Sequence, residues 1–270
     1  MFFPNATGWP RSGNQPMLPY RPPTGPVAYQ PGPTQPFQHM QLQTAPMANT
    51  QAAHFAPPAS YPASNQPAVW NRLQPYLAHS PTLSRQLTQL AHSGWSIQWN
   101  PHQPALCDSV TRRINIDPAL PDPIVMQYLA HEVRHAFEIP VDTRLYASDV
   151  DYASVKMRNE AVAVVNHLRV RSEIFQGSGH DIGFSQPNAA YYENALHFSR
   201  SHGNEERLLQ HIQRLMTWDL TGMHLRPYWE VYLNGWRDHR GLPPVSVPPG
   251  MAEGQQMQAW QSLAAEMNGR

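Results

Sequence analysis

Proline divides this sequence into two parts of very different composition. Residues 1–68 hold 15 of the 29 prolines, and their only charged residues are Arg11 and Arg21. Each proline removes a backbone donor and disfavours helix at the residue before it, and large aliphatic side chains are too few here to offset the entropy of ordering the chain. Residues 1–68 are therefore predicted to be a disordered Pro/Gln-rich arm. It would be a secretion signal, a ligand for a proline-binding partner, or a solvated spacer.

The charge balance and the single cysteine exclude several classes of protein. Lys+Arg and Asp+Glu both number 19, which argues against a polybasic nucleic-acid binder. One cysteine, Cys107, excludes a disulfide framework or a cysteine-based structural zinc site within one chain. No apolar run approaches the ~18 residues of a membrane span, and the N-terminus lacks the pattern of a signal peptide. We expect a soluble protein that is either cytoplasmic or secreted by a route without a signal peptide.

Beyond the arm, the hydrophobic pattern becomes that of a folded domain. Over residues 69–241, apolar residues recur at helical spacing in several stretches and alternate, as in strands, in two short ones. The pattern indicates an α+β domain, mainly α, with a small β-sheet and one core. Residues 242–270 are predicted to be a Pro-rich linker followed by a tail helix. The predicted helices cover 81–93, 122–139, 154–175, 188–200, 204–218 and 226–237, and the predicted strands are 95–99 and 113–116.

A His-Glu-x-x-His motif is the feature of this sequence that points most directly to a chemical function. His131, Glu132 and His135 fall inside the helix predicted to begin at residue 122. Positions four apart lie on one face of a helix, so both imidazoles can bind a single Zn²⁺. Glu132 is displaced by about 100° around the helix and reaches the edge of such a site, where the general base for a metal-bound water belongs. The alternative is a surface helix with two exposed histidines and a salt-bridging glutamate.

A catalytic zinc site has a third protein ligand. The metzincin continuation needs glycine at position 138 and histidine at position 141, but the chain has Glu138 and Val141 there. A glutamate on the next helix is the other common solution, and Glu160 is the predicted ligand. The alternative for Glu160 is an exposed helical glutamate. The acids that compete with it are Asp149, Asp151 and Glu173.

The pairing of this motif with Glu160 resembles the gluzincin branch of zinc metallopeptidases. More narrowly, LAHEVRHAFE, RNEAVAVVNHLRVRSEI and the preceding RINIDP are similar to the compact zinc metallopeptidase domains that bacteria inject as type III or type VI secretion effectors. The resemblance covers about residues 95–180. It implies a zincin-like domain with one Zn²⁺ per chain, held by His131, His135 and Glu160, with Glu132 as base. It also implies delivery into a host or competitor cell through the N-terminal arm, which would contact secretion-system components.

Two roles stay open. Asn159-Glu160 match the start of the Asn-Glu-x-x-Ser-Asp signature, but Ala163-Val164 stand where Ser-Asp would, so the acid that orients a zinc histidine is unassigned. The donor to the tetrahedral oxyanion is also open, because tyrosine and histidine are more often structural than catalytic. The candidates for the oxyanion or for support of the metal ligands are His180, Tyr191, Tyr192, Asn166, Arg169 and Asp181.

Three functions are consistent with these observations. The first is a zinc metallopeptidase, a secreted bacterial effector or toxin that hydrolyses peptide bonds in a target-cell protein. The second keeps the metal chemistry but cleaves the peptide stems of peptidoglycan in the periplasm. The third is a non-enzymatic secreted protein whose Pro-rich arm and aromatic faces bind partners, with the metal site incidental.

Overall fold

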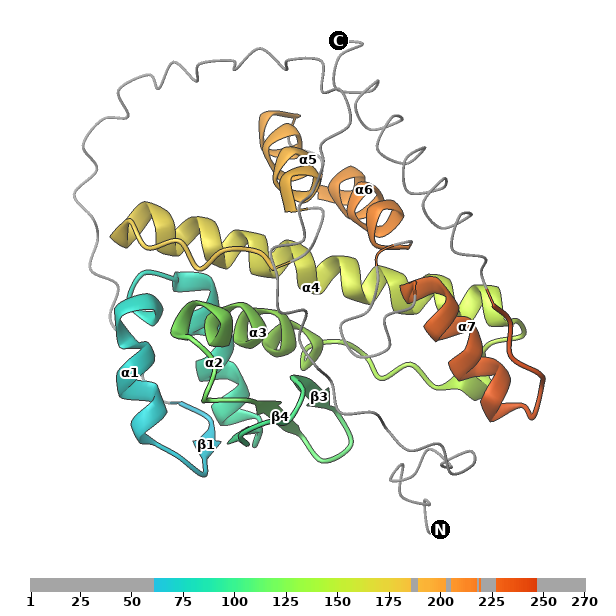
Figure 1. The fold of residues 1–270 in the computed structure, drawn as a ribbon, viewed down its shortest axis with the longest axis horizontal. Coiled ribbons are helices and arrows are strands. Elements are labelled where there is room, and N and C mark those ends of the chain that lie inside the picture. Colours follow the sequence, from blue (N-terminus) through green and yellow to red (C-terminus); the bar gives the residue numbers. More distant parts are fainter. Residues whose placement is uncertain (1–60, 186–188, 203–204, 218, 220–226, 247–270) are drawn as a thin grey trace, which may run out of the picture. The chain divides into compact units, whose positions relative to one another are not determined.

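A computed structural model describes residues 61–246 except 186–188, 203–204, 218 and 220–226. The predicted arm up to residue 60 and the predicted tail from residue 247 lie outside the described residues. All described residues belong to one compact unit of the chain. Within them the chain forms seven α-helices, one short 3-10 helix and a small four-stranded sheet (Figure 1). The prediction of a mainly helical α+β fold is confirmed.

The sheet is small and mostly parallel. Its strand order is β1-β2-β4-β3, in which β2 pairs in parallel with β1 and β4, and β3 lies antiparallel to β4 at the edge. Both predicted strands are confirmed as β2 and β4, whose inward side chains, including Ile97 and Ile114, are fully buried. The other two strands were not predicted because they are too short to show an alternating pattern. The bounds are Ala63–Ser64 for β1, Ser96–Trp99 for β2, Leu106–Asp108 for β3 and Arg113–Ile116 for β4.

The folded unit includes residues that the sequence assigned to the arm. β1 lies within residues 61–67, and the side-chain amides of Asn65 and Gln66 donate to the carbonyl of Trp99 at 3.2 and 2.8 Å. Helix α1 (Ala68–Leu77) follows directly. The prolines that suggested disorder here are tolerated because one adjoins a short edge strand and the other precedes the first turn of a helix.

Helices α2 and α3 pack beside the sheet. α2 (Pro81–His92) begins at Ser80, whose hydroxyl accepts a hydrogen bond from the Leu83 N–H, and this is the predicted start signal. Gly94 adopts a φ of +74° just beyond the helix, where a glycine is favoured. α3 (Asp122–His135) ends four residues earlier than predicted, and the 3-10 turn η1 (Thr143–Leu145) follows it.

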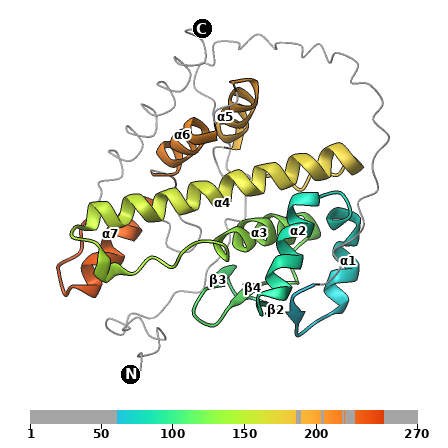
Figure 2. The same ribbon diagram turned by 180° about the vertical axis from the view of Figure 1, so that it is seen from behind.

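The long helix α4 (Asp149–Ser178) joins two apolar cores (Figures 1 and 2). It starts five residues earlier than predicted because Ser148 caps its first turn, accepting from the Asp151 N–H. It ends at Gly179, which has a φ of +75°, rather than at the predicted stop, Gly177. One core contains the sheet and α1–α3, and the other contains α5 and α6.

The last three helices match their predicted bounds within two residues. They are α5 (Ala189–His202), α6 (Glu205–Thr217) and α7 (Tyr228–His239). α6 and α7 both pack against α4, on which α3 also lies. The helix that carries the predicted histidines and the helix that carries Glu160 are therefore direct neighbours.

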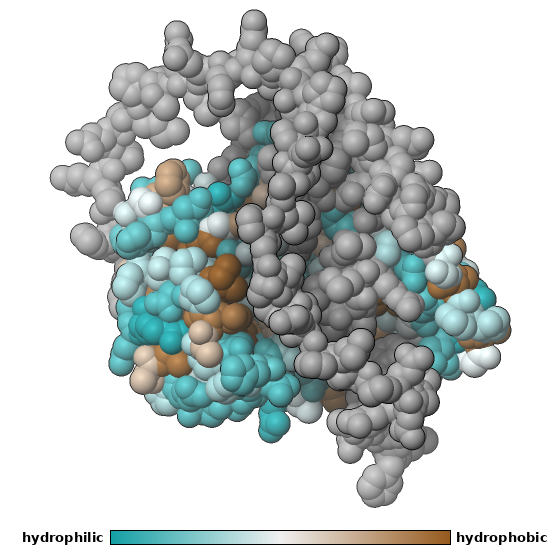
Figure 3. Space-filling model, in the orientation of Figure 1, coloured by the Kyte–Doolittle hydropathy of each residue, from teal (hydrophilic) through white to brown (hydrophobic). Residues whose placement is uncertain are grey.

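The described surface carries few large apolar side chains. Figure 3 shows hydrophilic residues over most of the described part of one face, with apolar residues between them. Among the described helices, none combines the length and apolar character that a membrane crossing needs.

Candidate metal centre

Three predicted ligands converge where α3 and α4 pack together. The Nε2 atoms of His131 and His135 lie 3.0 Å apart. Oε2 of Glu160 lies 3.3 Å from the first nitrogen and 3.5 Å from the second. The two imidazoles meet because they stand one helical turn apart on the last turns of α3, and α4 brings the carboxylate against them. One side chain from α4 thus completes a three-atom cluster that α3 alone could not form.

The spacing of these atoms fits a metal ion. Ligands at ~2.0–2.2 Å from a tetrahedral zinc ion stand about 3.3–3.5 Å from one another, and the observed separations are 3.0–3.5 Å. Two imidazoles and one carboxylate form a donor set that divalent transition metals accept. His131, His135 and Glu160 therefore form a group that can hold a metal ion.

The cluster is largely shielded from water. The side chains of His131, His135 and Glu160 are 19%, 16% and 9% exposed, which is inconsistent with two solvent-facing histidines and an exposed glutamate. Burial disfavours the imidazolium form of His135, but the carboxylates of Glu160 and Glu138 favour it more, and the pKa of His135 rises well above its ordinary value. Burial opposes ionisation of Glu160, yet the two imidazoles lower its pKa well below the usual range. A metal ion would take the place of the proton on His135.

Two further side chains contact the predicted metal ligands His135 and Glu160. Oε2 of Glu138 lies 3.1 Å from Nδ1 of His135, and the hydroxyl of Tyr232 on α7 donates to Oε1 of Glu160 at 2.5 Å. Contacts of this kind orient a metal ligand and fix the tautomer of a histidine. Sequence reasoning missed both. Glu138 stands three residues after His135 and could have been found from helical spacing, whereas Tyr232 is 72 residues from its partner and gave no comparable signal.

Glu132 lies beside the cluster without belonging to it. Its carboxylate interacts electrostatically with His131, His135 and Glu160, and more weakly with the backbone of Cys107 on β3. Burial raises the pKa of Glu132 above the ordinary value, the two histidines oppose that rise, and Glu160 adds to it. Glu132 is therefore a buried carboxylate that interacts both with the candidate metal ligands and with the edge strand β3.

The acids that competed with Glu160 have other partners. Asp149 pairs with Arg237 at 2.8 Å, and Asp151 accepts from the hydroxyl of Ser148. Glu173 accepts from the hydroxyls of Ser80 and Thr82 at 2.7 and 2.5 Å and so holds the start of α2. Among the described residues, Glu160 is the acid whose carboxylate forms a possible metal-binding group with His131 and His135.

Asn166 and Arg169 lie further along α4 and do not reach the cluster. The side-chain amide of Asn166 donates to the Ala130 carbonyl at 2.7 Å and is paired with Gln86, so it ties α4 to α3 next to His131. Arg169 pairs with Glu205 at 3.2 Å in a half-exposed position. Neither side chain contacts a predicted metal ligand, and both instead link α4 to neighbouring helices.

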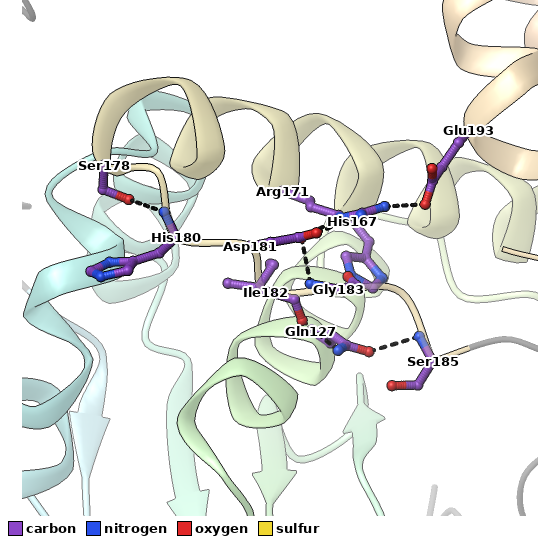
Figure 4. A network of polar contacts seen from close by, with 10 residues as sticks. All are labelled: Gln127, His167, Arg171, Ser178, His180, Asp181, Ile182, Gly183, Ser185 and Glu193. Carbon is purple, nitrogen blue, oxygen red and sulfur yellow. Dashed lines mark hydrogen bonds and ion pairs between the residues drawn. The ribbon is translucent and has the colours of Figure 1, made fainter. Parts of the chain in front are cut away.

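Two other predicted residues, His180 and Asp181, lie in the segment that follows α4 and runs back along it past Arg171 and His167 (Figure 4). The end of that helix is about 27 Å along its axis from Glu160, at 1.5 Å per residue. Just beyond it, the ring of His180 lies against Tyr76, and Asp181 pairs with Arg171 at 2.6 Å.

Tyr191 and Tyr192, on α5, are not brought to the cluster either. The hydroxyl of Tyr192 donates to Asp219, and the ring of Tyr191 packs at the border of the second apolar core. The described partners of His180, Asp181 and Tyr192 thus belong to other parts of the fold than the metal-ligand cluster.

No protein-family model, curated protein or solved structure matches this chain. What the protein does is therefore inferred from the chemistry of its own residues.

Proposed function

We propose that this protein is a zinc-dependent metallopeptidase in which His131, His135 and Glu160 hold the ion and Glu132 is the general base. The observation that carries the proposal is the convergence of two imidazole nitrogens and one carboxylate oxygen within 3.5 Å. Three protein ligands of these types are typical of catalytic zinc sites, which leave a fourth position for water or substrate.

The residues around the ion have distinct tasks. When bound, zinc supplies Lewis acidity, which makes a coordinated water easier to deprotonate and polarises a peptide carbonyl. The carboxylate of Glu132 takes a proton from the attacking water and delivers it to the leaving nitrogen. Its raised pKa favours this exchange, because a general acid–base group works best when its pKa approaches the working pH. Glu138 and Tyr232 keep His135 and Glu160 in position.

The edge of the sheet supports a peptide as the substrate. Among the described strands, β3 pairs only with β4, so its outer edge offers backbone donors and acceptors. An extended peptide can add to such an edge as a further strand. Because the backbone of Cys107 on β3 interacts with Glu132, a peptide on this edge would lie near the general base.

Metal content and one conservative substitution test the proposal. We expect about one zinc per chain in the purified protein, lost in H131A. E132Q should retain zinc but lose about 10²–10⁴-fold in the cleavage of a peptide library, the usual contribution of a general base. Full cleavage by E132Q, or a protein that binds no zinc, would contradict the assignment.

The site of action is a separate proposal that rests on the composition of the N-terminal arm. We propose that the arm directs secretion and that the target is a protein inside the recipient cell. Toxicity on expression in the cytosol but not in the periplasm supports this target, and the reverse result supports peptidoglycan stems. Toxicity that survives E132Q would favour a non-enzymatic interaction protein.

A further inference from the structure

Lys156 is the only lysine in the chain, and it lies beside the metal centre. It stands on α4 one turn before Glu160, so both side chains project from the same face of that helix. Its Nζ lies 5.4 Å from the centroid of the Tyr232 ring, and the hydroxyl of that tyrosine bonds to Glu160. The ammonium is thus held over an aromatic ring that itself contacts a metal ligand.

The ammonium has no carboxylate partner among the described residues, and it is half-buried. Arg158, two residues along the same helix, pairs through two nitrogens with Glu206 at 2.8 and 2.6 Å. An aromatic ring attracts a cation through its π face but accepts no conventional hydrogen bond, so within the described part of the chain the three N–H donors of Lys156 are left for another acceptor.

Lys156 also lies within electrostatic range of the edge strand β3. Its charge acts weakly on the side chain of Cys107 on that strand, while its ammonium lies over the Tyr232 ring on α7. Three carboxylates lie at the metal centre, the ligand Glu160 and its neighbours Glu132 and Glu138, and Lys156 forms an ion pair with none of them. A lysine that served only to neutralise these acids would be expected to contact one of them.

We infer that Lys156 binds a carboxylate of the substrate, so that the peptidase prefers peptides with a carboxylate close to the scissile bond. This inference rests on the proposed function. The carboxylate has two possible sources, an acidic side chain and a free C-terminus, and both present the same planar anion to a point charge.

Matched zinc-binding probes test the preference by binding alone. Butyrohydroxamate and succinic monohydroxamate have similar length, but only the second carries a carboxylate. In calorimetry on the zinc-loaded protein, we expect the acidic probe to bind at least about tenfold more tightly, the effect of one charge-assisted hydrogen bond. K156M and K156Q should lose this advantage while binding zinc and the neutral probe as before. R158M removes a cation from the opposite side of the helix and should keep the advantage.

The outcomes separate the two levels of inference. Equal affinity for both probes in the unaltered protein, or an advantage that survives in both Lys156 variants, would overturn the role of Lys156 and leave the metal centre standing. A protein that holds no zinc and binds neither probe would overturn the proposed function, and this inference with it. Three further probes, each a hydroxamate joined through a succinyl linker to one amino acid, then identify the source of the carboxylate. Alanine with a free C-terminus tests the terminal carboxylate, aspartate amide tests the acidic side chain, and alanine amide is the neutral reference for both.

Discussion

A single carboxylate, that of Glu138, is expected to set how tightly His135 holds a metal ion. Oε2 of Glu138 lies 3.1 Å from Nδ1 of His135, in a position that is 13% exposed. E138Q removes the charge but keeps the shape, so zinc affinity should fall about 10–100-fold, the usual cost of losing such a partner. Competition with a fluorescent chelator measures this. E206Q, on an exposed pair with Arg158, is the control, and equal affinities of E138Q and the unaltered protein would show that Glu138 does not orient the histidine.

The same histidine is expected to make the proposed zinc binding depend on pH. Glu160 and Glu138 raise the pKa of His135 well above its ordinary value of 6.5, so zinc must displace a proton over a range that extends past neutrality. Zinc affinity should rise about tenfold per pH unit until the raised pKa is passed. Calorimetry between pH 6 and 9 measures this, and an affinity that is flat across that range would contradict it.

The metal-free protein should show the opposite trend. A raised folded-state pKa contributes stability that is complete below the unfolded value and is lost as pH rises through the folded value. Stability from the pairing of His135 with Glu160 should therefore decline above neutral pH once zinc has been removed.

Some residues of the candidate site could be predicted from the sequence and others could not. His131, Glu132 and His135 are spaced by one turn of a single helix, so local periodicity suffices. Glu160 required the further assumption that the next helix folds back onto the first. Tyr232 and Lys156 depend on how α7 packs against α4, and no local pattern encodes that packing.

The alignment of α3 with α4 depends on a buried amide. Asn166 donates to the carbonyl of Ala130, next to His131, and also pairs with Gln86. N166A should lower the free energy of unfolding by about 1–3 kcal/mol, because it leaves buried polar groups without a partner. Urea denaturation measures this, and Q176A, at an exposed position of the same helix, should change stability by less than about 0.5 kcal/mol. Equal stability of N166A and Q176A would show that the amide is dispensable.

Helices were predicted better than strands for a physical reason. A long amphipathic helix repeats its signal several times, and capping residues such as Ser80 mark where it begins. β1 and β3 have two and three residues and exist because of their sheet neighbours. The early start of α4 at its Ser148 cap was equally readable, since serine followed by acidic residues in the first turn is a helix-start pattern.

The molecule as a whole is expected to keep its stability without residues 1–60, and to lose stability when residues 61–68 are removed as well. A protein lacking residues 1–60 should keep its melting temperature and its zinc. Removing residues 1–68 also deletes β1 and the bonds of Asn65 and Gln66 to Trp99, so it should be destabilised by at least about 1 kcal/mol. Thermal melts of the two truncated proteins measure the difference, and identical curves would move the boundary back to residue 68.

Zinc K-edge X-ray absorption of the zinc-loaded protein examines the metal centre itself. The proposed zinc site predicts one ion per chain with two imidazole nitrogens at about 2.0–2.1 Å and the remaining ligands oxygen, and a weaker, altered oxygen contribution in E160Q. A spectrum without imidazole scattering, or one with sulfur from Cys107 in the coordination sphere, would contradict the assignment of His131, His135 and Glu160 as the ligands.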